Sequence, residues 1–201
     1  KMAVIIMELA GIEYNNIFHP TFSGVAQSYN YYPVSYMKRN EGVVFTALGL
    51  GKTIVDGEKS LRFSPKYPDI LSQYYSIKST ISNSQNKFYA LNMNKGKNPI
   101  KSGESRNLKS YDLSFAEKNG SLKHLASVIS NEDNILRDSL KYNGCRVITF
   151  SGILKYERFP LSKIIIYLMK LGEKALGCPV EIEFAVNLKD KQKDEFSLLQ
   201  I

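Results

Sequence analysis

Glycine spacing in the stretch Val43–Gly57 is the first feature of this sequence that could do chemistry. An apolar, strand-like run leads to Gly49 and Gly51, where the absence of a side chain lets the backbone approach a neighbouring group closely. Lys52 and Thr53 follow at once, at the place where the first amides of a helix are available to an anion. The stretch therefore has the composition of a phosphate-binding turn.

Neither of the common phosphate-binding motifs fits this spacing. A P-loop requires a glycine five residues before Gly51, where the chain has Thr46. The dinucleotide fingerprint requires a third glycine where the chain has Ile54. From the spacing alone, a plain strand–turn–helix joint is an equally good interpretation, because glycine occurs in turns of every kind.

Two carboxylates near the end of the chain form a second candidate. Because side chains alternate along a strand, Glu181 and Glu183 would share one face of a strand over Val180–Val186, with Ile182 on the other face. Gln200 lies on the following strand. One carboxylate and one amide oxygen on adjacent strands can hold Mg²⁺, which prefers hard oxygen ligands and keeps several waters. The alternative interpretation is a set of polar residues on an exposed face of a sheet.

Three other residues have chemically active side chains but weaker signals. Arg62 follows the glycine stretch, and a cation beside a nucleotide cradle can offset phosphate charge. A surface salt bridge is the simpler interpretation of Arg62. His19 and His124 have no second ligand at metal-binding spacing, so both are predicted to be structural.

Three blocks of sequence, in the same order, resemble the pyruvate phosphate dikinase and phosphoenolpyruvate synthase family. Ala47–Gly51, followed by Val55–Gly57, resembles the family's "GLGE…V.G" segment. Ser23–Ala26 resembles its "SGV" strand. Glu181–Ala185, followed by Leu198–Gln200, resembles its closing "DIEW/F…LLQ.RP" segment. Ordered blocks that span nearly the whole chain are more specific than any one of them.

The resemblance implies the C-terminal part of an ATP-grasp nucleotide-binding domain, with ATP and Mg²⁺ as cofactors. The family usually has glutamate at the position of Lys52, so the charge is reversed there. The residues that the resemblance assigns to nucleotide binding are Glu8, Gly49, Gly51 and Lys52, and those that it assigns to the metal are Glu183 and Gln200.

A parent enzyme of this family would move phosphate from ATP to a carrier histidine and on to pyruvate or a similar acceptor. Its amino-terminal lobe and phosphohistidine domain would lie outside residues 1–201 and would be partners of this chain. We therefore expect a fragment, inactive alone, of a longer cytoplasmic protein. Lys52 and a polar, subgroup-specific insertion near residues 76–109 leave open a non-catalytic regulatory or scaffolding module that kept the fold.

The local signals predict an α+β fold with a mainly antiparallel sheet and few helices. Pro160–Leu176 is the strongest helix, because proline suits its first turn, an apolar stripe follows, and Gly177 and Pro179 end it. Asn119-Gly120 predicts a hairpin turn. The expected strands are residues 2–9, which would be buried on both faces, and residues 21–28, 32–37, 43–48, 61–64, 88–93, 111–115, 122–128, 145–150, 180–186 and 196–200.

Composition is ordinary for a soluble globular protein, with 43% hydrophobic and 23% charged residues and no apolar run long enough to span a membrane. Cys145 and Cys178 have no disulfide-framework or CxxC spacing and are predicted to be buried free thiols. The net charge of +8 suits an anionic partner such as a nucleotide. Much of that charge lies between residues 87 and 109, in a stretch typical of a solvated loop. No recognition-helix or zinc-knuckle pattern supports nucleic-acid binding.

Overall fold

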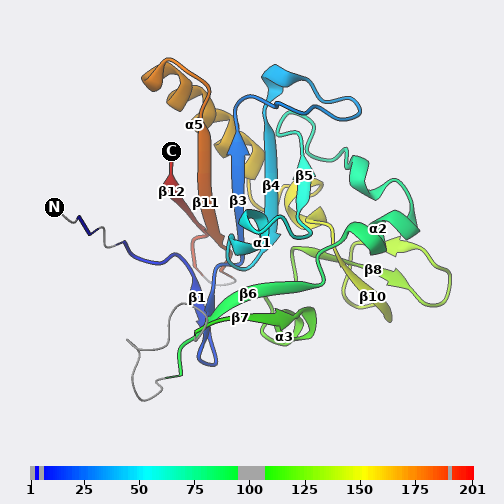
Figure 1. Cartoon of the computed structure of the whole chain (residues 1–201). Helices are drawn as coiled ribbons and strands as arrows, with labels where there is room; N and C mark the ends of the chain where they lie inside the picture. The colour runs from blue at the N-terminus through cyan, green and yellow to red at the C-terminus, as the bar shows by residue number, and fades with distance from the viewer. Residues whose placement is uncertain (1–2, 5–6, 95–106, 190–191) are drawn as a thin grey trace.

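The computed structural model describes residues 3–4, 7–94, 107–189 and 192–201, which form three antiparallel sheets and five α-helices (Figure 1). The elements, in chain order, are β1 (Ile12–Tyr14), β2 (Ile17–His19), β3 (Phe22–Gln27), η1 (Arg39–Glu41), β4 (Val43–Leu48), α1 (Lys52–Val55), β5 (Leu61–Phe63), η2 (Ser72–Tyr74), α2 (Ile77–Asn83), β6 (Lys87–Asn92), β7 (Leu108–Asp112), α3 (Leu113–Lys118), β8 (Ala126–Ser130), β9 (Leu136–Arg137), β10 (Gly144–Ile148), α4 (Ser151–Leu154), α5 (Leu161–Leu176), β11 (Glu181–Asn187) and β12 (Glu195–Gln200). The predicted α+β class is confirmed.

The largest sheet has the strand order β12-β11-β3-β4-β5, and every neighbouring pair is antiparallel. One face of this sheet is fully buried. Its residues Ala26, Val44, Phe63 and Ile182 are 0% exposed and share a single core with Ile165 of α5. Figure 1 shows α5 behind the sheet, with the sheet β1-β2-β6-β7 below it and the sheet β10-β8-β9 to one side. The opposite face of the five-stranded sheet is therefore the one left to bind a ligand.

Helix α5 confirms the sequence prediction almost residue for residue. It begins at Leu161, directly after Pro160, and buries Leu161, Ile165 and Met169. Gly177 adopts a left-handed conformation with φ +70°, and its N–H donates to the carbonyl of Glu173. This is the helix stop that glycine provides most readily, because it has no Cβ to clash.

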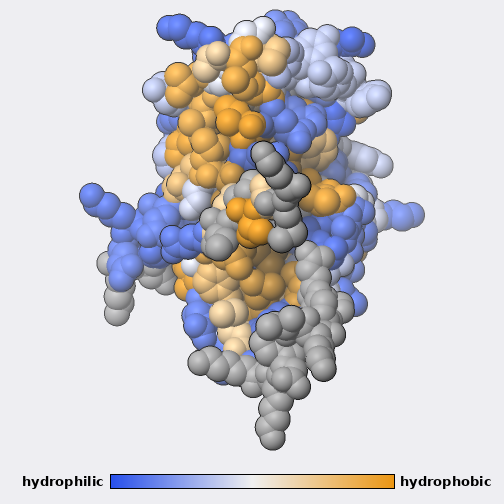
Figure 2. Space-filling view, turned by 60° about the vertical axis from the view of Figure 1, so that its left-hand side comes forward, coloured by the Kyte–Doolittle hydropathy of each residue, from blue (hydrophilic) through white to orange (hydrophobic). Residues whose placement is uncertain are grey.

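An apolar groove of about 420 Å³ lies between α5 and β12. Figure 2 shows apolar side chains on the side of the molecule where these two elements lie. Tyr167 and Leu198, which line the groove, are 67% and 47% exposed. Within the described part of the chain, no helix combines the length and the apolarity that crossing a bilayer requires.

Three of the predicted strands are wrong. Residues 3–4 and 7–10 form no strand, and Val4, Met7 and Leu9 are exposed, so the apolar start is not a buried strand as far as it is described; residues 2, 5 and 6 lie outside the described part. Residues 32–37 form a loop with a turn at residues 35–36, and the hydroxyl of Tyr36 donates to the carbonyl of Ile70. In residues 32–37, tertiary contacts override the local β-propensity.

The third strand error lies in residues 111–128. Asp112 stands at the N-cap of α3, so residues 113–118 are helical and only the first two residues of the expected strand belong to β7. Asn119-Gly120 ends this helix rather than forming a hairpin, and β8 begins only at Ala126. Turn signals do not distinguish the end of a helix from the bend of a hairpin, because both use residues that tolerate left-handed backbone.

The polar stretch near residues 76–109 is anchored to the rest of the fold where it is described. The amide side chain of Gln85, which is buried, accepts from the backbone N–H of Leu48 and donates to the carbonyl of the same residue. Its strand β6 pairs with β2 and β7. The charges of Lys95, Lys97, Lys101 and Arg106 lie outside the described residues. Cys145 and Cys178 are free and exposed, so the prediction of buried thiols is wrong.

His19 is fully buried and joins three elements, which confirms its structural role. Its Nδ1 lies 2.8 Å from the carbonyl oxygen of Pro20, so Nδ1 carries the proton and donates, and Nε2 then accepts from the side-chain amide of Asn119 at 3.3 Å. The ring also packs between Tyr14 and Phe88, at centroid distances of 5.0 and 4.9 Å. Burial lowers the pKa of His19, because the protonated ring is poorly solvated there.

We expect His19 to make folding sensitive to acid. Its folded-state pKa lies below the unfolded value of about 6.5, so its contribution is complete above that pH and is lost as pH falls toward the folded pKa. Denaturant unfolding of the wild type and of His19→Asn between pH 8 and pH 4 measures this. The wild type should lose stability more steeply below pH 6.5 than the variant, whereas parallel curves would show that His19 does not titrate between the two states.

Candidate functional site

A row of backbone-paired residues crosses the open face of the five-stranded sheet. Glu183 on β11 pairs with Gln200 on β12 at one side and with Val25 on β3 at the other. Val25 pairs in turn with Phe45 on β4, and Phe45 pairs with Arg62 on β5. The row places a carboxylate and an amide at one end and a guanidinium at the other, with an apolar floor between them.

A bulge in β12 accounts for the position of Gln200. Glu183 pairs with Gln200, but the next residue, Phe184, pairs with Leu198, so Leu199 has no partner opposite it. An extra residue in one strand reverses the alternation of its side chains. Leu198 accordingly lines the groove against α5, whereas Gln200 lines a cavity on the other side of the sheet with Glu183.

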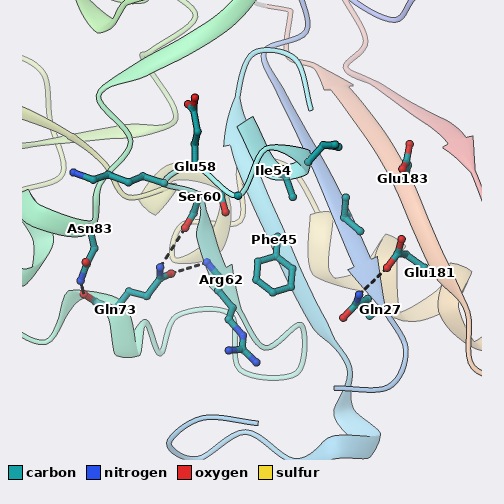
Figure 3. Close-up of a pocket in the computed structure, with 14 residues that line it drawn as sticks. Gln27, Phe45, Ile54, Glu58, Ser60, Arg62, Gln73, Asn83, Glu181 and Glu183 are labelled. Carbon is teal, nitrogen blue, oxygen red and sulfur yellow. Dashed lines mark hydrogen bonds between the residues drawn. The ribbon is translucent and has the colours of Figure 1, made fainter. Parts of the chain in front are cut away.

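Two cavities lie on this open face. The smaller one, of about 220 Å³, brings together four residues that the sequence nominated: Glu8, Gly51, Glu183 and Gln200. The larger one, of about 590 Å³, extends from Glu183 toward β5 and the segment after α1 (Figure 3). The polar side chains that line the larger cavity are Gln27, Glu58, Lys59, Ser60, Arg62, Gln73, Asn83, Glu181 and Glu183. Glu183 is thus shared by both cavities.

Gly49 and Lys52, the other two nominated residues, line neither cavity. Gly49 has φ +80°, and a Cβ there would lie 2.7 Å from Cδ2 of Phe88 and from the carbonyl oxygen of Tyr89. The ammonium of Lys52 lies 2.8 Å from the carboxylate of Asp56 and 5.5 Å from the ring centroid of Tyr89. The absence of a side chain at Gly49 therefore lets the end of β4 pack closely against β6. Lys52 interacts with Asp56 and Tyr89 and lines neither cavity.

Gly51 differs from Gly49 in this respect. It has a helical φ of −60°, and a Cβ there would meet only Cβ of Ser23, at 3.8 Å. The expectation that the glycines permit close backbone approach is confirmed for Gly49, whereas for Gly51 no described group of the protein lies that close. Gly51 instead lines the smaller cavity, where the absence of a side chain leaves room for a ligand.

The two carboxylates of β11 differ in their hydrogen bonding. Glu181 accepts a 2.6 Å hydrogen bond from the side-chain amide of Gln27, visible in Figure 3. Among the described residues, the side chains of Glu183 and Gln200 have no hydrogen-bond or ion-pair partner. Two unengaged oxygen groups on paired strands fit a hard cation such as Mg²⁺, which prefers such ligands and fills the remaining positions with water. No group of three or more metal-ligating His, Cys, Asp or Glu side chains occurs in the described part.

The family model for the pyruvate phosphate dikinase AMP/ATP-binding domain matches residues 1–201. The chain belongs to this family. Neither a curated protein nor a solved structure gave a significant match. As a pyruvate phosphate dikinase AMP/ATP-binding domain, the chain is a nucleotide-binding part of a protein of this type, and its antiparallel α+β architecture is consistent with an ATP-grasp-like domain. The open sheet face with its two cavities is the candidate nucleotide site.

The sequence makes Arg62 a candidate, but a surface salt bridge is the preferred interpretation there. Its Nη2 donates to the side-chain carbonyl of Asn30 at 2.9 Å and to the backbone carbonyl of Tyr32, and its guanidinium lies 5.5 Å from the ring centroid of Phe45. It forms no salt bridge with a described carboxylate, so that expectation is wrong. The alternation of Leu61, Arg62 and Phe63 was the available signal, because it puts Arg62 on the face opposite two core residues.

The two glycines provide a matched pair of variants. Gly49→Ala should destabilise the fold by about 1–2 kcal/mol from the left-handed backbone alone, and by more because Phe88 and Tyr89 must move. Gly51→Ala should change stability by no more than about 0.5 kcal/mol. Equal losses of unfolding free energy in urea titrations would contradict these different roles.

Proposed function

We propose that this chain is the ATP-binding part of a phosphoenolpyruvate synthase– or pyruvate phosphate dikinase–like phosphotransferase, which moves phosphate from ATP to a carrier histidine and on to pyruvate or a similar acceptor. The main support for this proposal is the cross-strand pair of Glu183 and Gln200. Their side chains line one cavity and have no hydrogen-bond or ion-pair partner among the described residues. The other domains of the parent chain, the amino-terminal lobe and the phosphohistidine domain, would be its partners in the cytoplasm.

In this proposal Glu183 and Gln200 hold Mg²⁺ with their side-chain oxygens. When bound, the ion supplies charge neutralisation at the phosphate oxygens, which is most of what phosphoryl transfer requires beyond positioning. Glu183 contributes a negative charge and Gln200 a neutral carbonyl oxygen. The half-buried position of Glu183 between two cavities would let its carboxylate orient the phosphate chain at the boundary between them.

The nucleotide itself is placed in the smaller cavity. Glu8 and Gly51 line this cavity together with the proposed metal pair, and apolar surface comes from Val25, Leu50 and Val55. Apolar side chains with a few polar groups are the usual lining of a small-molecule site, and at about 220 Å³ the smaller cavity would hold part of the nucleotide. The place of Glu8 in the lining of this cavity supports its assignment to nucleotide binding.

A non-catalytic regulatory or scaffolding module is the second candidate, and Lys52 favours it. The family's glutamate at this position is replaced by a cation that pairs with Asp56 and points at Tyr89, so a carboxylate for the ribose side is missing. A module of this kind would bind nucleotide without supporting phosphohistidine formation by its parent. Measurement of both properties therefore separates the two candidates.

Glu183→Gln should weaken Mg²⁺-dependent ATP binding by about 10- to 100-fold, because the charged ligand of the metal is lost while the shape is kept. Glu181→Gln is the matched control, one pleat away on the same strand face, and should bind within about threefold of the wild type because its carboxylate is engaged by Gln27. Calorimetric titration of MgATP into each variant measures this. An unchanged MgATP affinity of Glu183→Gln would contradict the metal assignment, and so would equal losses of affinity in both variants.

A further inference from the structure

The guanidinium of Arg62 is half-buried, lines the larger cavity and has unused donors. Its Nη2 donates to Asn30 and Tyr32. Its Nε is fully buried without an acceptor, and Nη1 has no acceptor among the described residues. Both acceptors of Nη2 are neutral, so the positive charge is not compensated by a described carboxylate. Leaving such donors and such a charge unpaired costs free energy.

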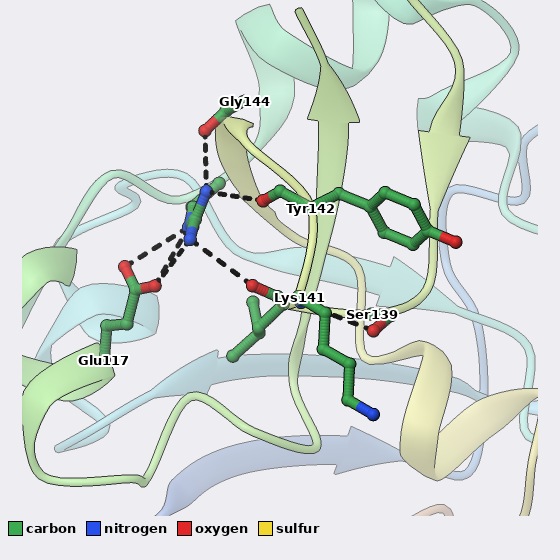
Figure 4. A network of polar contacts seen from close by, with 7 residues as sticks. Glu117, Ser139, Lys141, Tyr142 and Gly144 are labelled. Atoms are coloured by element: carbon green, nitrogen blue, oxygen red, sulfur yellow. Dashed lines mark hydrogen bonds and ion pairs between the residues drawn. The ribbon is translucent and has the colours of Figure 1, made fainter.

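Arg146 shows what a fully satisfied arginine looks like in the same molecule (Figure 4). Its Nε and Nη2 donate to the carboxylate of Glu117, with a shortest distance of 2.7 Å, and its Nη1 donates to the carbonyls of Tyr142 and Gly144. A further bond runs from Nη2 to the carbonyl of Leu140. Arg62 is half-buried like Arg146, but it has only neutral acceptors, all on Nη2. Its Nε is fully buried, so Nη1 is the donor that a group in the cavity could reach.

The amide side chains of Gln27, Gln73 and Asn83, which line the larger cavity, accept no hydrogen bond from the guanidinium of Arg62 and bond to other groups instead. Gln73 accepts from the backbone N–H of Arg62 and donates to the carbonyl of Ser60. Asn83 donates to the carbonyl of Gln73, and Gln27 donates to Glu181. Figure 3 shows these contacts around the cavity, with the ring of Phe45 between Arg62 and the two glutamates of β11. These hydrogen bonds hold the side chains that line the cavity in place, and the guanidinium of Arg62 keeps donors without an acceptor.

The position of Arg62 separates it from the metal pair. Three strand spacings, about 14 Å, divide the Cα atoms of Glu183 and Arg62 along the paired row. Val25 and Phe45 form the floor between them. Arg62 lines the larger cavity but not the smaller one, in which the proposed function puts the nucleotide.

We propose that Arg62 binds an oxyanion, a phosphate or carboxylate group on the acceptor side of the reaction, in the larger cavity and apart from the phosphates of the nucleotide. This inference rests on the proposed function, which places the nucleotide in the smaller cavity. A guanidinium suits this role because its planar donors match the geometry of phosphate and carboxylate oxygens, and because it remains charged when partly buried. Its bonds to Asn30 and Tyr32 keep it oriented without neutralising it.

The test uses inorganic phosphate as the probe, titrated calorimetrically into the 201-residue chain with and without saturating MgATP. We expect Arg62→Met to weaken phosphate binding at least tenfold and Arg62→Lys, which keeps the charge, to weaken it less. Arg39→Met is the matched control, because Arg39 is an exposed arginine outside both cavities, and it should bind as the wild type does. MgATP should leave the phosphate affinity of the wild type unchanged within about twofold.

Three results would overturn the inference: no detectable phosphate binding by the wild type, unchanged binding by Arg62→Met, or displacement of phosphate by MgATP. The last would assign Arg62 to the phosphates of the nucleotide itself. Thermal unfolding of each variant shows whether it is folded. If Arg62→Met does not fold, phosphate binding by Arg62→Lys still tests the inference. Arg62-dependent phosphate binding in a chain that binds no ATP would contradict the proposed function while supporting the oxyanion site.

Discussion

Backbone pairing in the five-stranded sheet is the constraint on which the site depends. The register that sets Glu183 opposite Gln200 and Val25 also sets Phe45 opposite Arg62. Because side chains alternate with a period of two, a slip of one residue in any strand would move these groups into the core and expose the apolar face. The burial of Ile182, Ala26, Val44 and Phe63 in one core therefore fixes the polar row on the other side as firmly as it fixes the core.

Much of this arrangement can be predicted from the sequence, because it follows from short-range rules. Helix α5 has its start and stop signals next to its own residues, and the alternation of Glu181, Ile182 and Glu183 specifies a half-buried strand. The positive φ of Gly49 follows from the turn chemistry of glycine. Resemblance in three ordered blocks supplied the family, which the match over residues 1–201 confirmed.

What could not be predicted depends on contacts between distant segments. No local signal marks the bulge at Leu199, yet it alone turns Gln200 toward Glu183. Segments 32–37 and 111–115 have strand-like composition, but side-chain contacts and an N-cap position decide their structure. The unsatisfied state of Arg62 is a property of its surroundings, since its nearest polar neighbours come from residues 30, 32 and 73. The amino-acid sequence identifies such a residue but does not show which of its hydrogen-bond donors lack an acceptor.

The central claim is that the paired ends of β11 and β12 hold the metal–nucleotide complex. Paramagnetic broadening by Mn²⁺ with ATP, read from backbone amide resonances, tests it most directly, because the effect falls steeply with distance from the ion. The account predicts the strongest broadening at Glu183 and Gln200, with a weaker effect at Phe45 and a weaker one again at Arg62. Broadening centred elsewhere, for example at the exposed carboxylates of Glu132 and Asp133, would contradict it.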